Sequence, residues 1–141
     1  MTTSRFSRPL SDADILLRVA IVALTLATAY IHLTLGGLLF TLNGIGYVVG
    51  AAAMVAPLTL AVRYRWLVRI GLAAYAATTI AAWVIDPLFF STAYVAKAIE
   101  VALIALLVLD FARRDGNPVA RIRSEIRSLP ARPQGPASGR A

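Results

Sequence analysis

A stretch of 44 residues, from Val19 to Val62, contains no Asp, Glu, Lys or Arg. As one α-helix it would be about 66 Å long, at about 1.5 Å per residue. The hydrocarbon core of a bilayer is only about 30 Å thick, so within a membrane the stretch must fold back once. Gly36-Gly37 is the natural break, because paired glycines weaken a helix and accept turn geometry. The stretch therefore predicts two antiparallel helices, over residues 12–35 and 38–61.

The composition also indicates a membrane protein with a single domain. Of the 141 residues, 59% are hydrophobic and 15% are charged, whereas soluble domains average about 45–50% and about 25%. The chain contains no cysteine, which excludes disulfides, thiolate metal sites and cysteine nucleophiles. The first apolar run is too long for a cleavable signal peptide.

Two further helices are predicted after the basic stretch "RYRWLVR". One covers residues 66–85 and ends at Asp86-Pro87, because proline disfavours helix in the residue before it. The other covers residues 91–112. The prediction is an all-α fold, a four-transmembrane-helix bundle over residues 12–112. It is flanked by an N-terminal segment, residues 1–11, and a basic tail, residues 113–141.

The arginines predict the orientation of this bundle. Thirteen of the fourteen basic residues are Arg, and all thirteen fall on one side of a four-span arrangement. The two opposite loops contain neither Arg nor Lys. Because basic residues concentrate in cytoplasmic loops, we expect both termini in the cytoplasm. Topology thus explains the net charge of +7, and without a recognition motif we expect no nucleic-acid partner.

The tail contains an amphipathic segment over residues 118–129. Its apolar stripe consists of Val119, Ile122, Ile126 and Leu129. The basic residues off this stripe are Arg121, Arg123 and Arg127. This pattern predicts a short interfacial helix whose arginines contact anionic lipid headgroups of the inner leaflet. The alternative is a solvated, partly disordered tail, and we expect the chain after residue 129 to be disordered in either case.

Five polar or ionisable residues fall in the outer half of the predicted bundle. They are His32, Asn43, Asp86, Lys97 and Glu100. Lys97 and Glu100 are three residues apart and therefore share one face of a helix. A charge at the bilayer centre costs on the order of 3 kcal/mol, so this pair should face the bundle. We predict that the five residues form one polar cluster.

Two roles are open for this cluster. It could be a polar lock that sets the helix register, as polar contacts do in membrane bundles. It could instead be an outward-facing pocket for a small ligand, a proton or an ion. His32 is one ligand where zinc needs three or four, so we expect no metal and no cofactor. A hydrogen-bonded structural role is favoured for His32, although an imidazole beside Glu100 is also suited to accept a proton.

Helix 38–61 carries two packing features. Gly46 and Gly50 form a G-x-x-x-G motif, in which small residues allow close helix contact. The partner could be the third helix or a second copy of the protein, so a homodimer or a larger membrane complex is among the expected partners. Pro57 is expected to kink this helix near its inner end.

The patterns "AYIHLTLGGLLFTLNGIGYVVGAAAMVAP" and "TAYVAKAIEVALIALLVL" resemble a group of small uncharacterised four-helix bacterial membrane proteins. The shared elements are Ile-His-Leu, Leu-Asn and Lys-x-x-Glu, over about residues 15–112. The group's longer first outer loop is reduced here to little more than Gly36-Gly37. The resemblance implies a bacterial inner (plasma) membrane and carries over His32, Asn43, Lys97 and Glu100, without an activity.

Three functions are weighed on this basis. The favoured expectation is an accessory or structural membrane subunit, since no catalytic constellation is present. The alternative is a small transporter or a proton- or ion-binding membrane protein that uses the cluster around Glu100. A membrane enzyme is least favoured, because no hydrolase motif or Gly-rich phosphate loop occurs.

Overall fold

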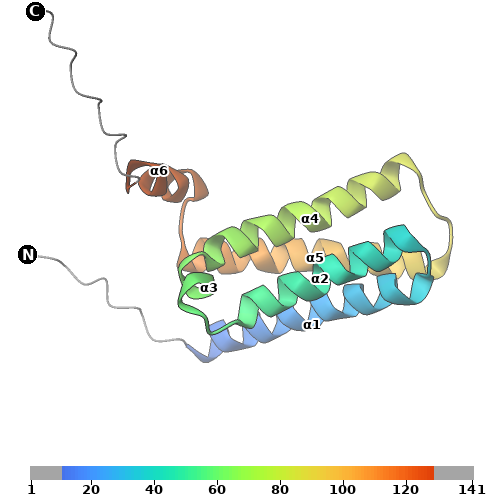
Figure 1. Ribbon diagram of the computed structural model, residues 1–141, viewed down its shortest axis with the longest axis horizontal. Coiled ribbons are helices and arrows are strands. Elements are labelled where there is room, and N and C mark those ends of the chain that lie inside the picture. The colour runs from blue at the N-terminus through green and yellow to red at the C-terminus, as the bar shows by residue number, and fades with distance from the viewer. Residues whose placement is uncertain (1–10, 129–141) are drawn as a thin grey trace, which may run out of the picture.

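A computed structural model describes residues 11–128, which are helical with no strand in that range (Figure 1). The elements are α1 (Asp12–Leu35), α2 (Leu38–Val55), α3 (Thr59–Arg63), α4 (Arg65–Ile85), α5 (Ser91–Arg114) and α6 (Pro118–Ser128). The first and third predicted ranges, 12–35 and 66–85, nearly coincide with α1 and α4, and the fourth is two residues shorter than α5. The predicted disorder after residue 129 and residues 1–10 of the N-terminal segment lie outside the described residues.

The long helices α1, α2, α4 and α5 lie side by side around a common core (Figure 1). Helix α1 contacts α2 and α5, and α4 contacts α5 and α2. The core side chains with no exposed surface include Ile21, Tyr47, Met54 and Leu103. The start of α1, together with α3 and α6, lies at one end of the bundle, here called the α6 end. The α1–α2 and α4–α5 connections lie at the opposite end, here called the turn end.

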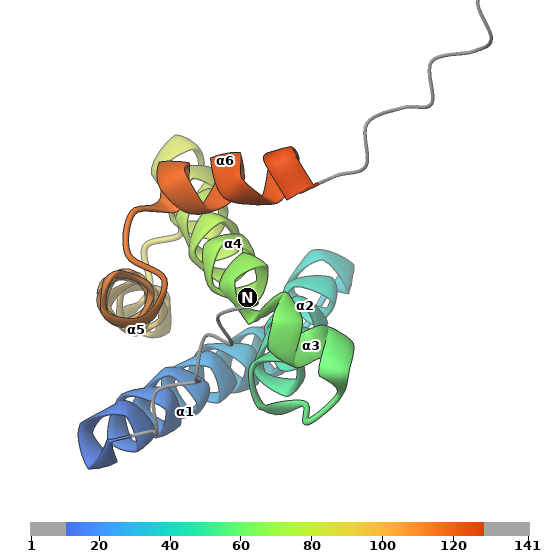
Figure 2. The same ribbon diagram turned by 90° about the vertical axis from the view of Figure 1, so that its left-hand side faces the viewer.

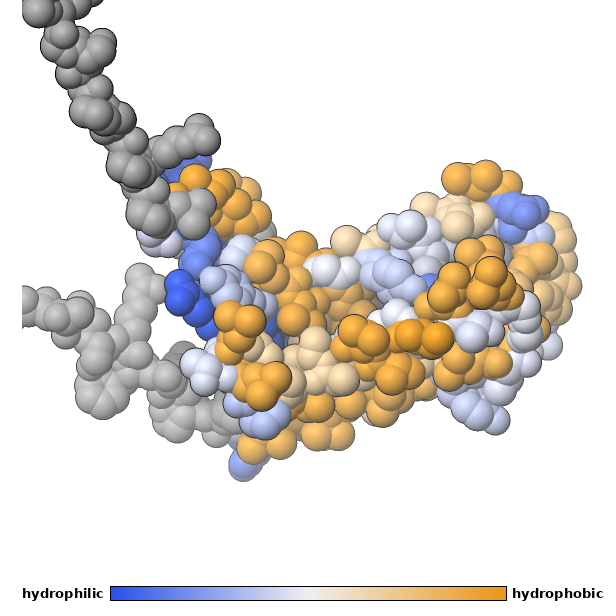
Figure 3. Space-filling model, in the orientation of Figure 1, coloured by the Kyte–Doolittle hydropathy of each residue, from blue (hydrophilic) through white to orange (hydrophobic). Residues whose placement is uncertain are grey.

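The outer surface of the bundle is apolar. Large hydrophobic side chains are exposed on every long helix, for example Leu16, Leu39, Ile85 and Val101. In Figure 3 such side chains cover much of the visible face, while strongly hydrophilic residues gather mainly at the α6 end. Within residues 11–128, three helices are long and apolar enough to cross a membrane: α1, α2 and α4. Helix α5 has 24 residues and carries charged side chains along its length.

The turn between α1 and α2 depends on its two glycines. Gly36 and Gly37 have φ angles of 74° and 82°, a region that side-chain-bearing residues rarely adopt. Helix α1 therefore ends at Leu35 and α2 begins at Leu38, so the charge-free stretch does fold back at the predicted point.

The second predicted helix, over 38–61, is divided in the structure. Helix α2 ends at Val55, and the short helix α3 begins at Thr59. Pro57 has no backbone N–H and disfavours helix in the residue before it. Accordingly Ala56 has φ −52° and ψ 126°, and Leu58 is also extended. The proline interrupts the helix instead of only bending it.

Gly46 and Gly50 of α2 lie against α4. A Cβ atom on Gly46 would lie 2.3 Å from Tyr75 Oη, and one on Gly50 would lie 2.8 Å from Leu72 Cδ1. Both distances are too short for real contacts, so a larger residue at either position would require the end of the Tyr75 or Leu72 side chain to shift. The G-x-x-x-G motif therefore packs against α4, the third predicted helix, where its two glycines leave room for the side chains of Tyr75 and Leu72.

Helix α6 lies crosswise at the end of α4, as Figure 2 shows. Asn117 Oδ1 accepts from the backbone N–H of Val119 at 2.9 Å and caps its start. The guanidinium of Arg121 lies over the Trp66 ring, 5.9 Å from its centroid. Arg63 Nη2 lies 3.9 Å from Glu125 Oε1. Leu129, the last residue of the predicted apolar stripe, is outside the described residues.

Candidate functional site

Glu100 occupies the interior of the bundle and has no exposed surface. Its Oε1 accepts hydrogen bonds from Tyr47 Oη at 3.0 Å and from Thr28 Oγ1 at 3.3 Å. Its Oε2 accepts from Lys97 Nζ at 2.6 Å. His32 Nε2 lies 3.7 Å from Oε1. Both carboxylate oxygens are therefore satisfied by protein donors.

These contacts extend to α4. Lys97 Nζ also donates to the backbone carbonyl of Thr79 at 3.2 Å. The hydroxyls of Tyr47 and Thr79 lie 3.1 Å apart and share a hydrogen bond. We call the set the Glu100 network; its members are Thr28, His32, Tyr47, Thr79, Lys97 and Glu100. The Glu100 carboxylate, on α5, bonds directly to side chains of α1 and α2. Helix α4 is joined through the contacts of Thr79 with Tyr47 and Lys97.

His32 is oriented by its own helix. Its Nδ1 lies 2.8 Å from the carbonyl oxygen of Thr28, so this nitrogen carries a hydrogen and donates it. The imidazole is 4% exposed and packs near Tyr47, with ring centroids 5.6 Å apart. Nε2 is left facing Glu100, and it is the atom at which His32 would exchange a proton.

Lys97 and Glu100 carry opposite charges, which makes their burial together tolerable. An unpaired charge in a low-dielectric interior is strongly disfavoured, and a close partner with further hydrogen bonds offsets that cost. The Lys97 side chain is 13% exposed. The pair shares one helix face, as the three-residue spacing predicts, and that face is turned to the bundle interior, as the cost of a charge in the bilayer predicts.

Two of the five predicted cluster residues lie apart from this network. Asp86 follows the end of α4 and is exposed, and within the described residues it forms no ion pair with Lys97. Asn43 is partly buried; its backbone carbonyl accepts from Tyr75 Oη at 3.2 Å. No hydrogen bond of the Asn43 side chain occurs in the part of the chain described. The structure brings together only His32, Lys97 and Glu100 from the predicted set.

Three members of the network were not expected from the sequence. Thr28 lies four residues before His32, a spacing that places both on one helix face and could have indicated it. Tyr47 lies four residues after Asn43 on α2, a weaker signal of the same kind. No sequence signal distinguishes Thr79 from the neighbouring Thr78.

A second buried charge network lies at the α6 end. Asp110 has no exposed surface and Arg69 is 4% exposed. Arg69 Nε donates to Asp110 Oδ2, and Arg69 Nη1 donates to Asp115 Oδ2 at 2.8 Å. Arg114 Nε donates to Asp110 Oδ1 at 2.9 Å. We call Arg69, Asp110, Arg114 and Asp115 the Asp110 network.

In the sequence, Arg69 is the last residue of the basic stretch RYRWLVR and is counted with the arginines between the helices. In the structure it is buried in the second turn of α4. A signal for this network is the four-residue spacing of Asp110 and Arg114. Asp14 adds a peripheral contact, with Oδ1 lying 3.6 Å from Arg113 Nη2 and 3.8 Å from Arg114 Nη2.

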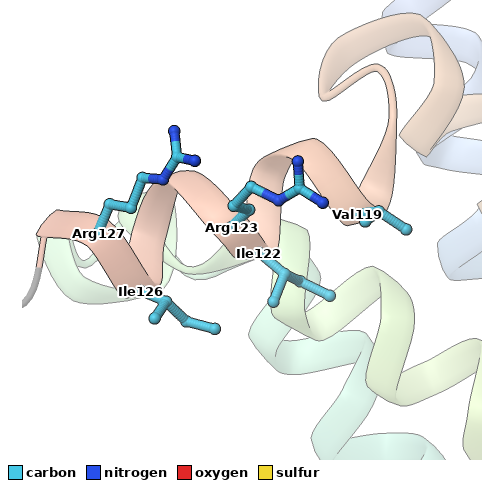
Figure 4. A pocket seen from close by; sticks show the side chains of 5 residues that line it. All are labelled: Val119, Ile122, Arg123, Ile126 and Arg127. Carbon is cyan, nitrogen blue, oxygen red and sulfur yellow. The ribbon is translucent and has the colours of Figure 1, made fainter.

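The predicted lipid-contact arginines differ in their surroundings. Figure 4 shows Arg123 and Arg127 extending to one side of α6, and Ile122 and Ile126 to the other. These four residues and Val119 line a shallow open groove along the helix. The three apolar side chains are between 42% and 62% exposed. Arg121 instead lies over Trp66, so only Arg123 and Arg127 extend beside the exposed apolar stripe.

Comparison of the chain with protein-family models, with curated proteins and with solved structures finds no match.

Proposed function

We propose that this protein is a small accessory or structural subunit of a bacterial inner (plasma) membrane. In this proposal α1, α2, α4 and α5 all cross the bilayer, and both termini are cytoplasmic. Three of these helices have the length and composition of spans. Helix α5, at 24 residues, is as long as α1. Its charged Lys97, Glu100 and Asp110 are all satisfied within the bundle, which makes α5 suited to span as well.

The arrangement at the α6 end supports the orientation. The arginines of α4, α5 and α6 gather there, and basic residues favour the cytoplasmic side. Helix α6 lies across the bundle axis, with an exposed apolar stripe and arginines beside it (Figures 2 and 4). That is the geometry of a helix lying on a membrane surface with anionic headgroups as its partner.

The structural role is supported by one observation: both carboxylate oxygens of Glu100 already accept hydrogen bonds from the protein. A carboxylate poised to bind a ligand would keep a free oxygen or an open approach, whereas both oxygens of Glu100 accept from side chains of the bundle. The donors come from three helices, and Lys97 extends the contact to α4. Such a network fixes the rotation and register of each helix against its neighbours. We propose that its role is to hold the bundle in one arrangement.

A second candidate function rests on one specific contact. His32 Nε2 and Glu100 Oε1 are 3.7 Å apart in a buried position. Imidazole changes protonation near neutral pH, and an acid–imidazole pair inside a membrane protein is suited to bind a proton. On this alternative the protein would be a small proton- or ion-binding membrane protein.

One comparison separates the two functions. Purified wild type and Glu100→Gln are measured in nanodiscs for thermal stability and for proton uptake across pH. The structural role predicts that Glu100→Gln lowers stability and that wild type shows no proton-uptake step assignable to Glu100 near neutral pH. The matched control is Asp86→Asn, which removes an exposed carboxylate at the turn end outside the network. A folded Glu100→Gln protein that lacks one proton-binding step of wild type would overturn the structural role in favour of proton binding.

A further inference from the structure

The α6 end contains buried hydrogen-bond donors that lack acceptors. Within the described residues, five buried side-chain nitrogens have no hydrogen-bond partner. They are Nε of Arg18, Arg65 and Arg121, Nε1 of Trp66, and Nη2 of Arg114. All five are N–H donors, and all belong to residues near the α6 end. Because buried polar groups in folded proteins are almost always paired, this one-sided excess points to a missing acceptor.

Three of these donors belong to one group of charges. Arg18 of α1 lies within electrostatic range of Arg65 of α4 and Arg114 of α5. Arg65 is likewise within range of Arg114. Three guanidinium groups from three helices therefore repel one another at the same end of the bundle, and Asp110 offsets part of that repulsion for Arg18 and Arg65. Trp66 and Arg121 are already in contact with each other, so they are left out of the site.

Within residues 11–128, no carboxylate forms an ion pair with Arg18 or Arg65, and most of the nearby carboxylate oxygens already have other partners. Both oxygens of Asp110 and one oxygen of Asp115 accept from the Asp110 network. Asp14 accepts from the backbone N–H of Ser11 and lies near Arg113 and Arg114. Neither Arg18 nor Arg65 forms an ion pair within residues 11–128; Arg65 Nη2 donates to the carbonyl of Ala56 at 2.9 Å, which leaves its Nε free.

We propose that the α6 end binds a phosphate group, with Arg18 and Arg65 as its principal donors and Arg114 Nη2 as a third. Phosphate oxygens present several acceptors at once, and they match the planar fork of a guanidinium. The anion would also relieve the repulsion among the three arginines. The group is either the phosphodiester of an anionic lipid headgroup or the phosphate of a soluble compound. The Glu100 network takes no part, so the site does not depend on the structural role proposed for that network; its lipid-headgroup form rests on the proposed membrane placement.

The test measures thermal unfolding of the full chain in a non-ionic detergent and phosphate-free buffer. The added probes are short-chain phosphatidylglycerol and inorganic phosphate, with chloride at matched ionic strength and a neutral glycolipid detergent as blanks. We expect a saturable rise in the melting temperature of wild type. In the double variant Arg18→Gln/Arg65→Gln, half-saturation should need about tenfold more probe for each arginine lost.

The matched control is Arg63→Gln, which removes one charge from the same end, at a side chain that is 66% exposed. It should keep the wild-type response. Without a probe, the single variant Arg18→Gln should be at least as stable as wild type, because it loses an unpaired donor and its repulsion with Arg65 and Arg114, whereas Arg65→Gln also loses the hydrogen bond to Ala56. A structural role for Arg18 would produce the opposite sign.

The two probes distinguish between a lipid headgroup and a soluble compound as the source of the phosphate group. A response to phosphatidylglycerol alone assigns a lipid headgroup, and a response to inorganic phosphate alone assigns a soluble phosphate compound. A response to both supports the shared chemistry. The proposal is overturned if neither probe raises the melting temperature above the blanks, or if the double variant responds as wild type does. Arg18→Lys keeps the charge without the fork; if it binds as tightly as wild type, guanidinium recognition is overturned even should the double variant fail to fold.

Discussion

The Glu100 and Asp110 networks each contain a carboxylate with no exposed surface, but they satisfy it in different ways. Glu100 is the one carboxylate of its network, and its donors are a lysine and two neutral hydroxyls. Asp110 shares its two arginines with Asp115 and, at longer range, with Asp14. The Glu100 network thus depends on a single acceptor, whereas the Asp110 network has acceptors that can replace one another. The Glu100 network should therefore be much more sensitive to loss of its carboxylate.

The largest expected effect is that of Glu100→Leu. The change leaves Lys97 partly buried without its anion and leaves the hydroxyls of Thr28 and Tyr47 without their acceptor. Breaking a buried ion pair by removing one partner costs about 3–5 kcal/mol. The free energy of unfolding in detergent micelles, measured with a denaturant, should fall by that amount.

The control for this prediction is the double variant Lys97→Leu/Glu100→Leu. Replacing both members of a buried pair by apolar groups often restores stability, so much of the loss should be recovered. If the two single losses simply add, Lys97 and Glu100 are not energetically coupled and the comparison of the two networks fails.

A smaller effect is expected for Asp110→Asn. Arg69 keeps its hydrogen bond to Asp115, and Arg114 keeps its proximity to Asp14, so neither charge is left isolated. We expect a loss of about 1.5–3 kcal/mol in the free energy of unfolding, the range for one hydrogen bond to a charged group. Adding Asp115→Asn should cost more than it does in the wild-type background, because Arg69 then has no carboxylate. A loss for Asp110→Asn as large as that for Glu100→Leu would show that the acceptors do not replace one another.

Much of the helical arrangement could be predicted because length and charge constrain it directly. The charge-free stretch requires a fold-back, and Gly36-Gly37 supplies it with two positive φ angles. The Lys97–Glu100 pair follows from spacing within one helix. The end of α2 at Val55 was harder to predict from the sequence, since a proline can either bend a helix or end it, depending on what surrounds it.

The composition of the candidate site was only partly predictable. Depth along a helix follows from residue number, but rotation about the helix axis depends on how neighbours pack. Asn43 and Asp86 lie in the half of the bundle nearer the turn end, yet their side chains do not join the Glu100 network. Arg69 differs from the sequence expectation in the other direction. Its charge indicated a position at the membrane surface, but in the structure its side chain is buried and pairs with Asp110. Only the packed bundle shows which polar residues meet.

The smallest expected effect is that of Tyr47→Phe. The change removes one of the donors to Glu100 and the hydrogen bond to Thr79, while the ring keeps its contacts with His32 and Tyr75. Glu100 keeps Lys97 and Thr28, so the loss should be about 0.5–1.5 kcal/mol in the free energy of unfolding, as for a typical single hydrogen bond.

Tyr94→Phe is the matched control, because Tyr94 is half exposed and its hydroxyl forms no hydrogen bond within the described residues. Denaturant unfolding should show no change for Tyr94→Phe and a clear loss for Tyr47→Phe. If the two variants behave alike, the hydroxyl of Tyr47 contributes nothing to holding the carboxylate. The Glu100 network would then reduce to the Lys97–Glu100 pair, and its contrast with the Asp110 network would rest on that pair alone.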